Sequence, residues 1–256
     1  MKELARRIEA AAGPLAATTF EAMYRNPFWN ERFGERGRKF AAQDGLHHIS
    51  YLVQALLAED AAILENYARW LQSVLTSRGI CTRHLAENFQ RLSAAIAREN
   101  FPRGEEAVRY LALAEAALEY ASGSPRELQR ASTRIAQRAA ASMYERHPEW
   151  EQKYGAPGRD RCVEDGLYHL SYLADSLALG RPDSFSSYCP WMASFLERLG
   201  MSRHHLEEML AAIGDGLKTD AALSAELTAS AIATLEAGRN AISGSVLPAH
   251  LHAAPR

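Results

Sequence analysis

The sequence DGLHHISYL at residues 44–52 returns as DGLYHLSYL at residues 165–173, a shift of 121 positions. The same shift aligns residues 27–93 with residues 148–214, where 21 of 67 positions are identical without a gap. A period of this length is too long for a solenoid repeat. We therefore interpret the chain as two copies of one domain, and we predict that the two aligned segments superpose.

Apolar residues recur in each copy with a period near 3.6, and good helix formers dominate, which predicts helices throughout. Glycine and proline divide this pattern into five helices per copy. The predicted helices span 3–30, 35–58, 61–78, 82–99 and 104–121, then 125–152, 157–179, 183–198, 202–217 and 220–240. We expect an all-α fold with domain 1 at 1–122, domain 2 at 123–242 and a disordered tail at 243–256. The joint is short, so the copies are expected to pack together through their long first helices.

The composition excludes several classes of protein. The chain has 256 residues, 47% of them hydrophobic, and a net charge of -2, so a nucleic-acid partner is not expected. No apolar run is long enough for a membrane span, and the N-terminus lacks the apolar core of a signal peptide. Three cysteines outside CxxC pairs indicate a reducing, cytoplasmic location, with neither a disulfide framework nor a zinc site.

Polar and aromatic residues form one stripe on the predicted second helix of each copy, at spacings of three, four and three. The stripe contains Cys162, Asp165, His169 and Tyr172 in the second copy, and Ala41, Asp44, His48 and Tyr51 in the first. Leucines run alongside the stripe, so it borders the core. An acid and an imidazole in such a position need hydrogen-bonding or charged partners, because a lone buried charge is costly. One interpretation is structural, with the acid and the histidine paired at i,i+4. Repetition of the whole set favours a binding site.

Neighbouring residues suggest what that site holds. Gly45 and Gly166 lie inside helices at a cost of about 1 kcal/mol, so a crossing helix or a flat ligand is expected to approach there. The third helix of each copy carries an aromatic pair that either packs in the core or lines a pocket for a conjugated ligand. These pairs are Tyr67 with Trp70 and Tyr188 with Trp191. Arginines at the start of the second helix, Arg36, Arg38, Arg159 and Arg161, either meet an anionic group or lie in solvent.

The second copy resembles the phycobiliproteins, the globin-fold family that holds linear tetrapyrroles. The matching residues are Cys162-Val163-Glu164-Asp165, Tyr168 and Tyr172, Leu179-Gly180-Arg181, the helix with Tyr188 and Trp191, and Leu199-Gly200-Met201. The resemblance implies two tandem globin-like domains and a pigment of the biliverdin or phycocyanobilin type. It also implies that Cys162 forms a thioether with the pigment and that Asp165 binds its pyrrole N–H groups. Glu164 stands where the family has a propionate-binding arginine, so Arg159 or Arg161 would take that role.

In the first copy Ala41 replaces the cysteine, so this copy would hold a pigment only non-covalently, or none. Cys162 could equally be a small buried hydrophobe. His48 and His169 are not part of the family motif, and in a globin fold they could meet a haem iron. A cofactor-free globin-like sensor or interaction module is a further alternative.

An enzyme is not expected, because the sequence has no nucleophile with a base in series, no HExxH and no phosphate loop. His84, His204 and His205 are metal-capable, but we interpret them as helix-start residues and predict no metal site. We therefore expect a non-enzymatic tetrapyrrole carrier or sensor, which could form a homo-oligomer.

Overall fold

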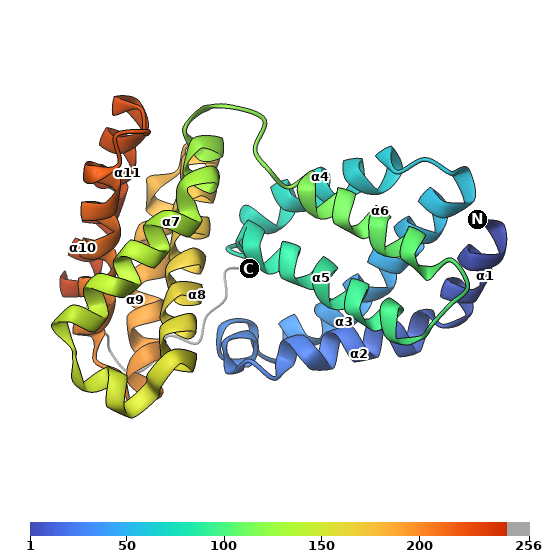
Figure 1. Cartoon of the computed structure of the whole chain (residues 1–256), viewed down its shortest axis with the longest axis horizontal. Helices are drawn as coiled ribbons and strands as arrows, with labels where there is room; N and C mark the ends of the chain where they lie inside the picture. The colour runs from blue at the N-terminus through green and yellow to red at the C-terminus, as the bar shows by residue number, and fades with distance from the viewer. Residues whose placement is uncertain (245–256) are drawn as a thin grey trace. The chain divides into compact units, whose positions relative to one another are not determined.

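The computed structural model describes residues 1–244, which form eleven α-helices and no strand (Figure 1). The chain divides into two compact units, Met1–Ala121 and a second that begins at Ser122. The all-α prediction is confirmed, and the globin-like arrangement stays a prediction. Of the predicted tail, Ser243 and Gly244 end the last helix, and the remaining residues lie outside the described part.

Within residues 1–244, unit 1 has six helices and unit 2 has five. In unit 1 these are α1 (Lys2–Ala10), α2 (Ala12–Tyr24), α3 (Pro27–Ala58), α4 (Ala62–Thr76), α5 (Thr82–Arg98) and α6 (Gly104–Ala116). In unit 2 they are α7 (Gly123–Arg146), α8 (Glu149–Leu179), α9 (Pro182–Arg198), α10 (Arg203–Thr219) and α11 (Ala225–Gly244).

The predicted first helix of unit 1, residues 3–30, is wrong at two places. Ala11 leaves helical geometry, with φ -94° and ψ 7°, and separates α1 from α2. Asn26 is extended, and its Oδ1 accepts a hydrogen bond of 3.0 Å from the Phe28 backbone N–H, so it caps a new helix. A proline follows Asn26, and a proline disfavours helical geometry in the residue before it.

The same error affects unit 2, where the predicted helix 125–152 ends at Arg146. His147 has φ -123° and ψ 64° and precedes Pro148, so α8 starts anew. The last helix, predicted at 220–240, begins later than predicted, at Ala225. Asp220 is extended, its Oδ1 accepts a hydrogen bond of 3.1 Å from the Ala222 N–H, and its carboxylate pairs with Arg134. This turn delays the start of α11.

The helix predicted as the second of each copy, α3 in unit 1 and α8 in unit 2, bends at a glycine. Gly34 in α3 has φ 58° and ψ -160°, and Gly155 in α8 has φ 56° and ψ -153°. A side chain is strained at such a positive φ, so glycine is the residue that fits. The two glycines are 121 positions apart, so the bend belongs to the repeat. The predicted starts at 35 and 157 match the second segment of each bent helix.

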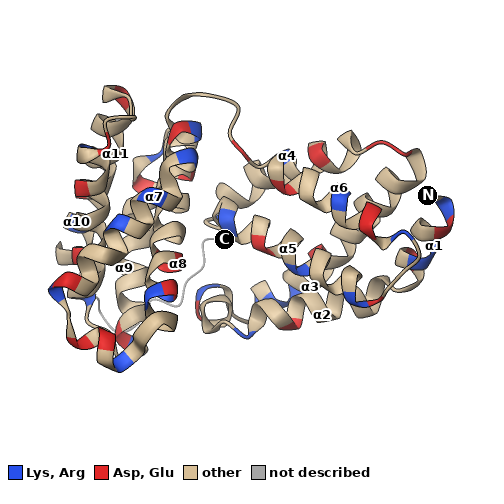
Figure 2. Ribbon diagram, in the orientation of Figure 1, with Lys and Arg blue, Asp and Glu red and all other residues tan. Residues whose placement is uncertain are grey.

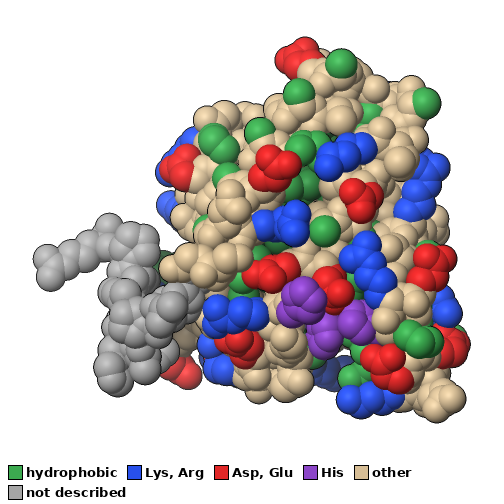
Figure 3. Space-filling model, turned by 90° about the vertical axis from the view of Figure 1, so that its left-hand side faces the viewer, with side chains coloured by type: hydrophobic (Ala, Val, Ile, Leu, Met, Phe, Trp, Pro, Cys, Tyr) green, Lys and Arg blue, Asp and Glu red, His purple; other side chains and the backbone are tan. Residues whose placement is uncertain are grey.

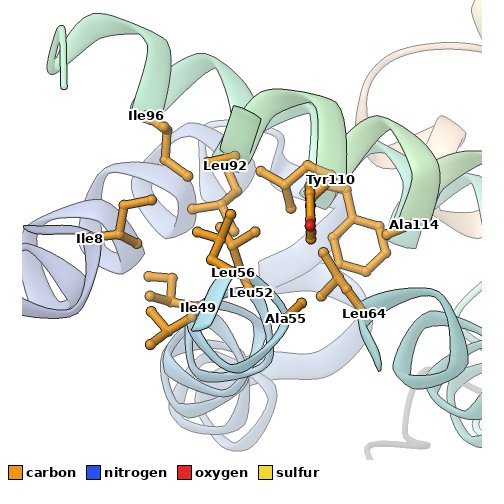
Figure 4. Close-up of a cluster of buried hydrophobic side chains, with 14 of the residues drawn as sticks. Ile8, Ile49, Leu52, Ala55, Leu56, Leu64, Leu92, Ile96, Tyr110 and Ala114 are labelled. Atoms are coloured by element: carbon orange, nitrogen blue, oxygen red, sulfur yellow. The ribbon is translucent and has the colours of Figure 1, made fainter. Parts of the chain in front are cut away.

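Side chains from all six helices of unit 1 meet in one core. Figure 4 shows Ile8 of α1, Ile49, Leu52 and Leu56 of α3, and Leu92 and Ile96 of α5 pointing toward one another, with Leu64 of α4 and Tyr110 and Ala114 of α6 beside them. In unit 2, α7 packs on α8 and α10, and α9 packs on α11. Burial of each large apolar side chain contributes about 1.5–3 kcal/mol, which holds the helices together.

The glycines of the repeated motif mark helix crossings. A Cβ at Gly45 would lie 3.3 Å from the Cβ of Ala16 on α2, and a Cβ at Gly166 would lie 3.3 Å from the Cβ of Ala136 on α7. Of the two expected neighbours, a crossing helix or a flat ligand, the structure places a helix there. The close contact fixes how α2 lies against α3 in unit 1 and how α7 lies against α8 in unit 2.

Basic and acidic residues are interspersed along the helices of both units (Figure 2). Among residues 1–244, no helix combines the length and the hydropathy that crossing a membrane requires.

We predict that Gly45→Val and Gly166→Val each lower the free energy of unfolding by about 1–3 kcal/mol, because the new side chain would collide with the crossing helix. Gly244→Val is the matched control, since that exposed glycine of α11 has open space around its Cβ position. The control should change stability by less than about 0.5 kcal/mol. Urea unfolding of the three variants tests this, and equal effects at all three positions would contradict the close crossing.

Candidate functional site

The centre of the repeated stripe is a buried histidine–tyrosine pair. A hydrogen bond of 2.7 Å joins His48 Nδ1 of α3 to the Tyr67 hydroxyl of α4, and one of 2.8 Å joins His169 Nδ1 of α8 to the Tyr188 hydroxyl of α9. Each of these tyrosines is also stacked on the tyrosine of the stripe. The ring centroids are 3.9 Å apart in Tyr51–Tyr67 and in Tyr172–Tyr188.

These pairs replace the expected contact between the acid and the histidine at i,i+4. Both imidazoles are buried, and burial lowers the pKa of His48 and of His169 to about 4. The histidines are therefore neutral near pH 7, and a neutral ring needs a hydrogen-bonding partner rather than an anion. Burial also raises the pKa of the Tyr67 phenol, with Asp44 and Tyr51 acting in the same direction. A protonated hydroxyl is thus available to the His48 imidazole.

The acids of the stripe lie nearer the surface. Asp165 keeps 37% of its side chain exposed and pairs with Arg161 at 2.9 Å. Burial raises the pKa of the Asp165 carboxyl to about 6, although the Arg161 charge acts against this. In unit 1 the pKa of Asp44 is also raised by burial, while His47 and Arg78 oppose the change. Both copies therefore hold a partly desolvated carboxyl at the same position.

Cys162 is partly buried one helical turn before Asp165. Burial raises the pKa of its thiol to about 11, the Asp165 charge adds to this, and Arg159 opposes it. Thiolate is consequently scarce near neutral pH, and the thiol is a slow nucleophile. Cys189 is fully buried, and burial raises its pKa to about 12. Of these two thiols, Cys162 is the accessible one.

The remaining predicted residues divide between core and surface. Tyr67 and Tyr188 are core residues, whereas Trp70 is 57% exposed, so Tyr67 and Trp70 do not share one buried wall. Trp191 is partly buried and stacked on Phe195, with ring centroids 5.3 Å apart.

The arginines contact residues of their own units. The guanidinium of Arg159 lies 4.4 Å from the centroid of the Tyr144 ring and pairs with Glu151 at 2.7 Å. Arg38 lies 5.2 Å from the centroid of the Tyr24 ring, the equivalent stacking in unit 1. Both arginines are exposed, so their contacts are open to exchange.

A second cluster was not predicted as a site. His147, between α7 and α8, meets His205 and Glu208 of α10, with one possible ligand atom from each residue within 4.8 Å of the others. The sequence signal was HHLEE at residues 204–208, where histidine and glutamate share one helix face. The third residue is 58 positions earlier, and only the packing of α10 against α7 brings it close.

No protein-family model matches the chain, and neither a curated protein nor a solved structure shows significant similarity to it.

We predict that the free energy of unfolding falls as the pH is lowered from about 6.5 to about 4. In this window the unfolded chain protonates His48 and His169, whose ordinary pKa is about 6.5, while the folded chain keeps them neutral. His84 acts in the same direction, since burial lowers its pKa to about 3. Asp165 acts oppositely between about pH 4 and 6, because the folded state protonates it first. Asp44, whose pKa is also raised by burial, acts in the same direction as Asp165, and the three histidines outweigh these two carboxyls.

Urea unfolding at several pH values measures this dependence. The variant His48→Gln/His169→Gln should show a shallower slope whatever its absolute stability, with each histidine contributing at most about 1.4 kcal/mol per pH unit. An unchanged slope would mean that these two rings titrate normally in the folded protein.

We also predict that Cys162 reacts slowly with iodoacetamide near pH 8, and that Asp165→Asn speeds the reaction about two- to tenfold. Removal of the carboxylate charge lowers the thiol pKa, and each pKa unit is a tenfold change in thiolate. Peptide mass spectrometry follows Cys162 separately from the other thiols. Asp160→Asn, an exposed acid on the same helix, is the control and should leave the rate unchanged. Equal reaction rates of Cys162 in the two variants would show that the Asp165 charge does not affect this thiol.

Proposed function

We propose that the chain is a non-enzymatic protein that binds a linear tetrapyrrole on α8 of unit 2. The observation that supports this best is the pairing of a partly buried carboxyl, Asp165, with a partly buried thiol, Cys162, one helical turn apart on the same face. A linear tetrapyrrole carries pyrrole N–H donors at its centre, reactive carbon substituents at its edge and two propionates. Its three kinds of group match the chemistry of this face.

The carboxyl is the centre of the proposed site. Burial raises the pKa of this carboxyl although Arg161 opposes it, and pyrrole N–H groups would supply further donors that stabilise the ionised form. Arg161 now pairs with Asp165 and Glu164, at 2.9 and 2.7 Å. Its guanidinium is half exposed and could move to a propionate, which it binds in a bidentate manner. Exposed Arg159 could serve the second propionate.

A thioether at Cys162 is the covalent form of this proposal. The sulfur would add to a carbon–carbon double bond of the pigment, and the thiol proton would end on the neighbouring carbon, so no oxidant is needed. The raised thiol pKa makes spontaneous addition slow, so non-covalent binding comes first. In unit 1, Asp44 is retained and Ala41 replaces the cysteine, so that unit can hold a pigment only non-covalently.

The haem alternative finds less support. His48 and His169 are the candidate iron ligands, yet each ring is buried and its Nδ1 is hydrogen-bonded to a tyrosine. An iron would have to bind the other ring nitrogen, Nε2, and a haem beside that ring would have to displace the side chains that bury it. The same closed packing favours a second candidate function, a cofactor-free sensor or interaction module, in which protein side chains alone fill the centre of each unit.

Co-expression with enzymes of bilin synthesis, followed by an absorbance spectrum, tests the proposal. The parent protein should purify with a long-wavelength band, and Asp165→Asn should shift or bleach it because no anion holds the protonated pigment. Asp44→Asn is the matched control from the other copy, and it should leave the unit 2 band in place. A colourless parent protein would favour the cofactor-free module.

Attachment is tested on a denaturing gel of the loaded protein. A zinc-fluorescent band should be present in the parent, vanish in Cys162→Ala and persist in Cys189→Ala. A coloured protein without this band binds its pigment non-covalently, which contradicts the thioether and leaves the pigment site intact.

A further inference from the structure

The cluster of His147, His205 and Glu208 has the composition of a cation site. In Figure 3, which faces the side where α10 and α11 lie, histidine side chains gather beside acidic ones. His147 Nε2 lies 2.7 Å from Glu208 Oε2, and His147 Nδ1 lies 3.5 Å from Glu149 Oε1. His204 contributes a further ring, with its Nε2 3.6 Å from Glu208 Oε1.

These groups are partly withdrawn from water. The side chains of His147 and Glu208 are only 18% and 17% exposed. His205 is partly buried, and its Nδ1 is buried without a hydrogen-bond partner among residues 1–244. A buried ring nitrogen without a hydrogen bond destabilises the fold, and a ligand in the cluster would remove that cost.

The protonation states suit a metal. Burial raises the pKa of Glu208, but the hydrogen bond from His147 and the three nearby histidines outweigh it, so the pKa is lowered and the carboxylate is ionised. Burial, followed by the charge of His147, lowers the pKa of His205 and keeps that ring neutral near pH 7. An ionised carboxylate and a neutral imidazole are the forms that coordinate a divalent cation.

We propose that His147, His205 and Glu208 bind one divalent cation of the zinc class, with water or His204 at the fourth position. Two imidazole nitrogens and one carboxylate oxygen are a ligand set that Zn²⁺ takes in proteins. Tetrahedral coordination needs ligand atoms about 3.3 Å apart, so the cluster, now spread over 4.8 Å, contracts slightly around the ion. The hydrogen bond between His147 and Glu208 is replaced by two bonds to the metal.

The surrounding helices prepare this geometry. His205 and Glu208 are three positions apart on the first turns of α10 and so share one face. The ring of His147 is stacked on Trp150 of α8, with centroids 4.5 Å apart and 14° between the planes, which holds it toward α10. The bound ion would tie the corner between α7 and α8 to α10 and stabilise unit 2.

Unit 1 shows the same positions with different chemistry. The equivalent of His147 is Asn26, whose side chain caps α3. The equivalent of His205 is His84, which is buried and stacked on Phe28 with centroids 4.6 Å apart. Glu87, the equivalent of Glu208, pairs with Arg91 at 2.9 Å. The proposed site is therefore specific to unit 2. The substitution His147→Asn replaces one of its ligands with the residue that unit 1 has at the equivalent position.

Calorimetric titration of the full chain with Zn²⁺, after treatment with a chelator, tests the site. The parent should bind one ion, with Co²⁺ at the same site giving the visible absorption of a tetrahedral complex, and Zn²⁺ should raise the melting temperature. His147→Asn and Glu208→Gln should weaken binding at least about tenfold. His47→Gln removes an exposed histidine of unit 1 and should bind as the parent does.

The variant His147→Asn is expected to fold normally, because asparagine occupies the equivalent position in unit 1. Far-UV circular dichroism should match the parent. Binding that survives His147→Asn, or a parent that takes up no ion, would overturn the proposal. Binding that disappears instead in His250→Gln/His252→Gln would assign the metal to residues outside the described part and would equally overturn it.

Discussion

The buried hydrogen bond between an imidazole and a phenol is the constraint on which the rest of each unit depends. His48 with Tyr67, and His169 with Tyr188, join the second long helix of a unit to the helix that follows it. A buried imidazole without a partner would be costly, so the bond fixes the rotation of α3 against α4 and of α8 against α9. With that rotation fixed, the acid one turn earlier must lie at the edge of the core.

This position at the edge of the core explains why the two halves of the stripe differ in burial. Its C-terminal half, the histidine and the second tyrosine, is locked into the core by hydrogen bonding and stacking. Its N-terminal half, Cys162 and Asp165, is only partly buried and keeps groups that can meet a ligand. The glycine between the halves lets α2 or α7 approach to contact distance, so the core is closed by protein at that level. A pigment is consequently proposed for the N-terminal half alone.

The two units share the residues that set their helix bends and helix contacts, but they differ in the chemistry of partly exposed positions. The bent glycines, the helix-crossing glycines and the histidine–tyrosine pairs occur in both. The thiol of Cys162 and the imidazole of His147 occur only in unit 2, where Ala41 and Asn26 are their counterparts. Positions that hold helices together tolerate few residues, whereas partly exposed positions can acquire or lose a ligand group without loss of the fold.

The sequence by itself determined the helical class, the twofold repeat and the stripe of Asp165, His169 and Tyr172, because helical periodicity and internal similarity are local properties. The predicted helices 3–30 and 125–152 missed the boundaries at Asn26 and His147, although the proline after each residue was a signal for them. Only the tertiary structure decided that the histidines pair with Tyr67 and Tyr188, and that His147 meets His205. Those partners lie 19 and 58 positions away, and which side chains meet over such distances depends on how helices pack, which no local pattern encodes.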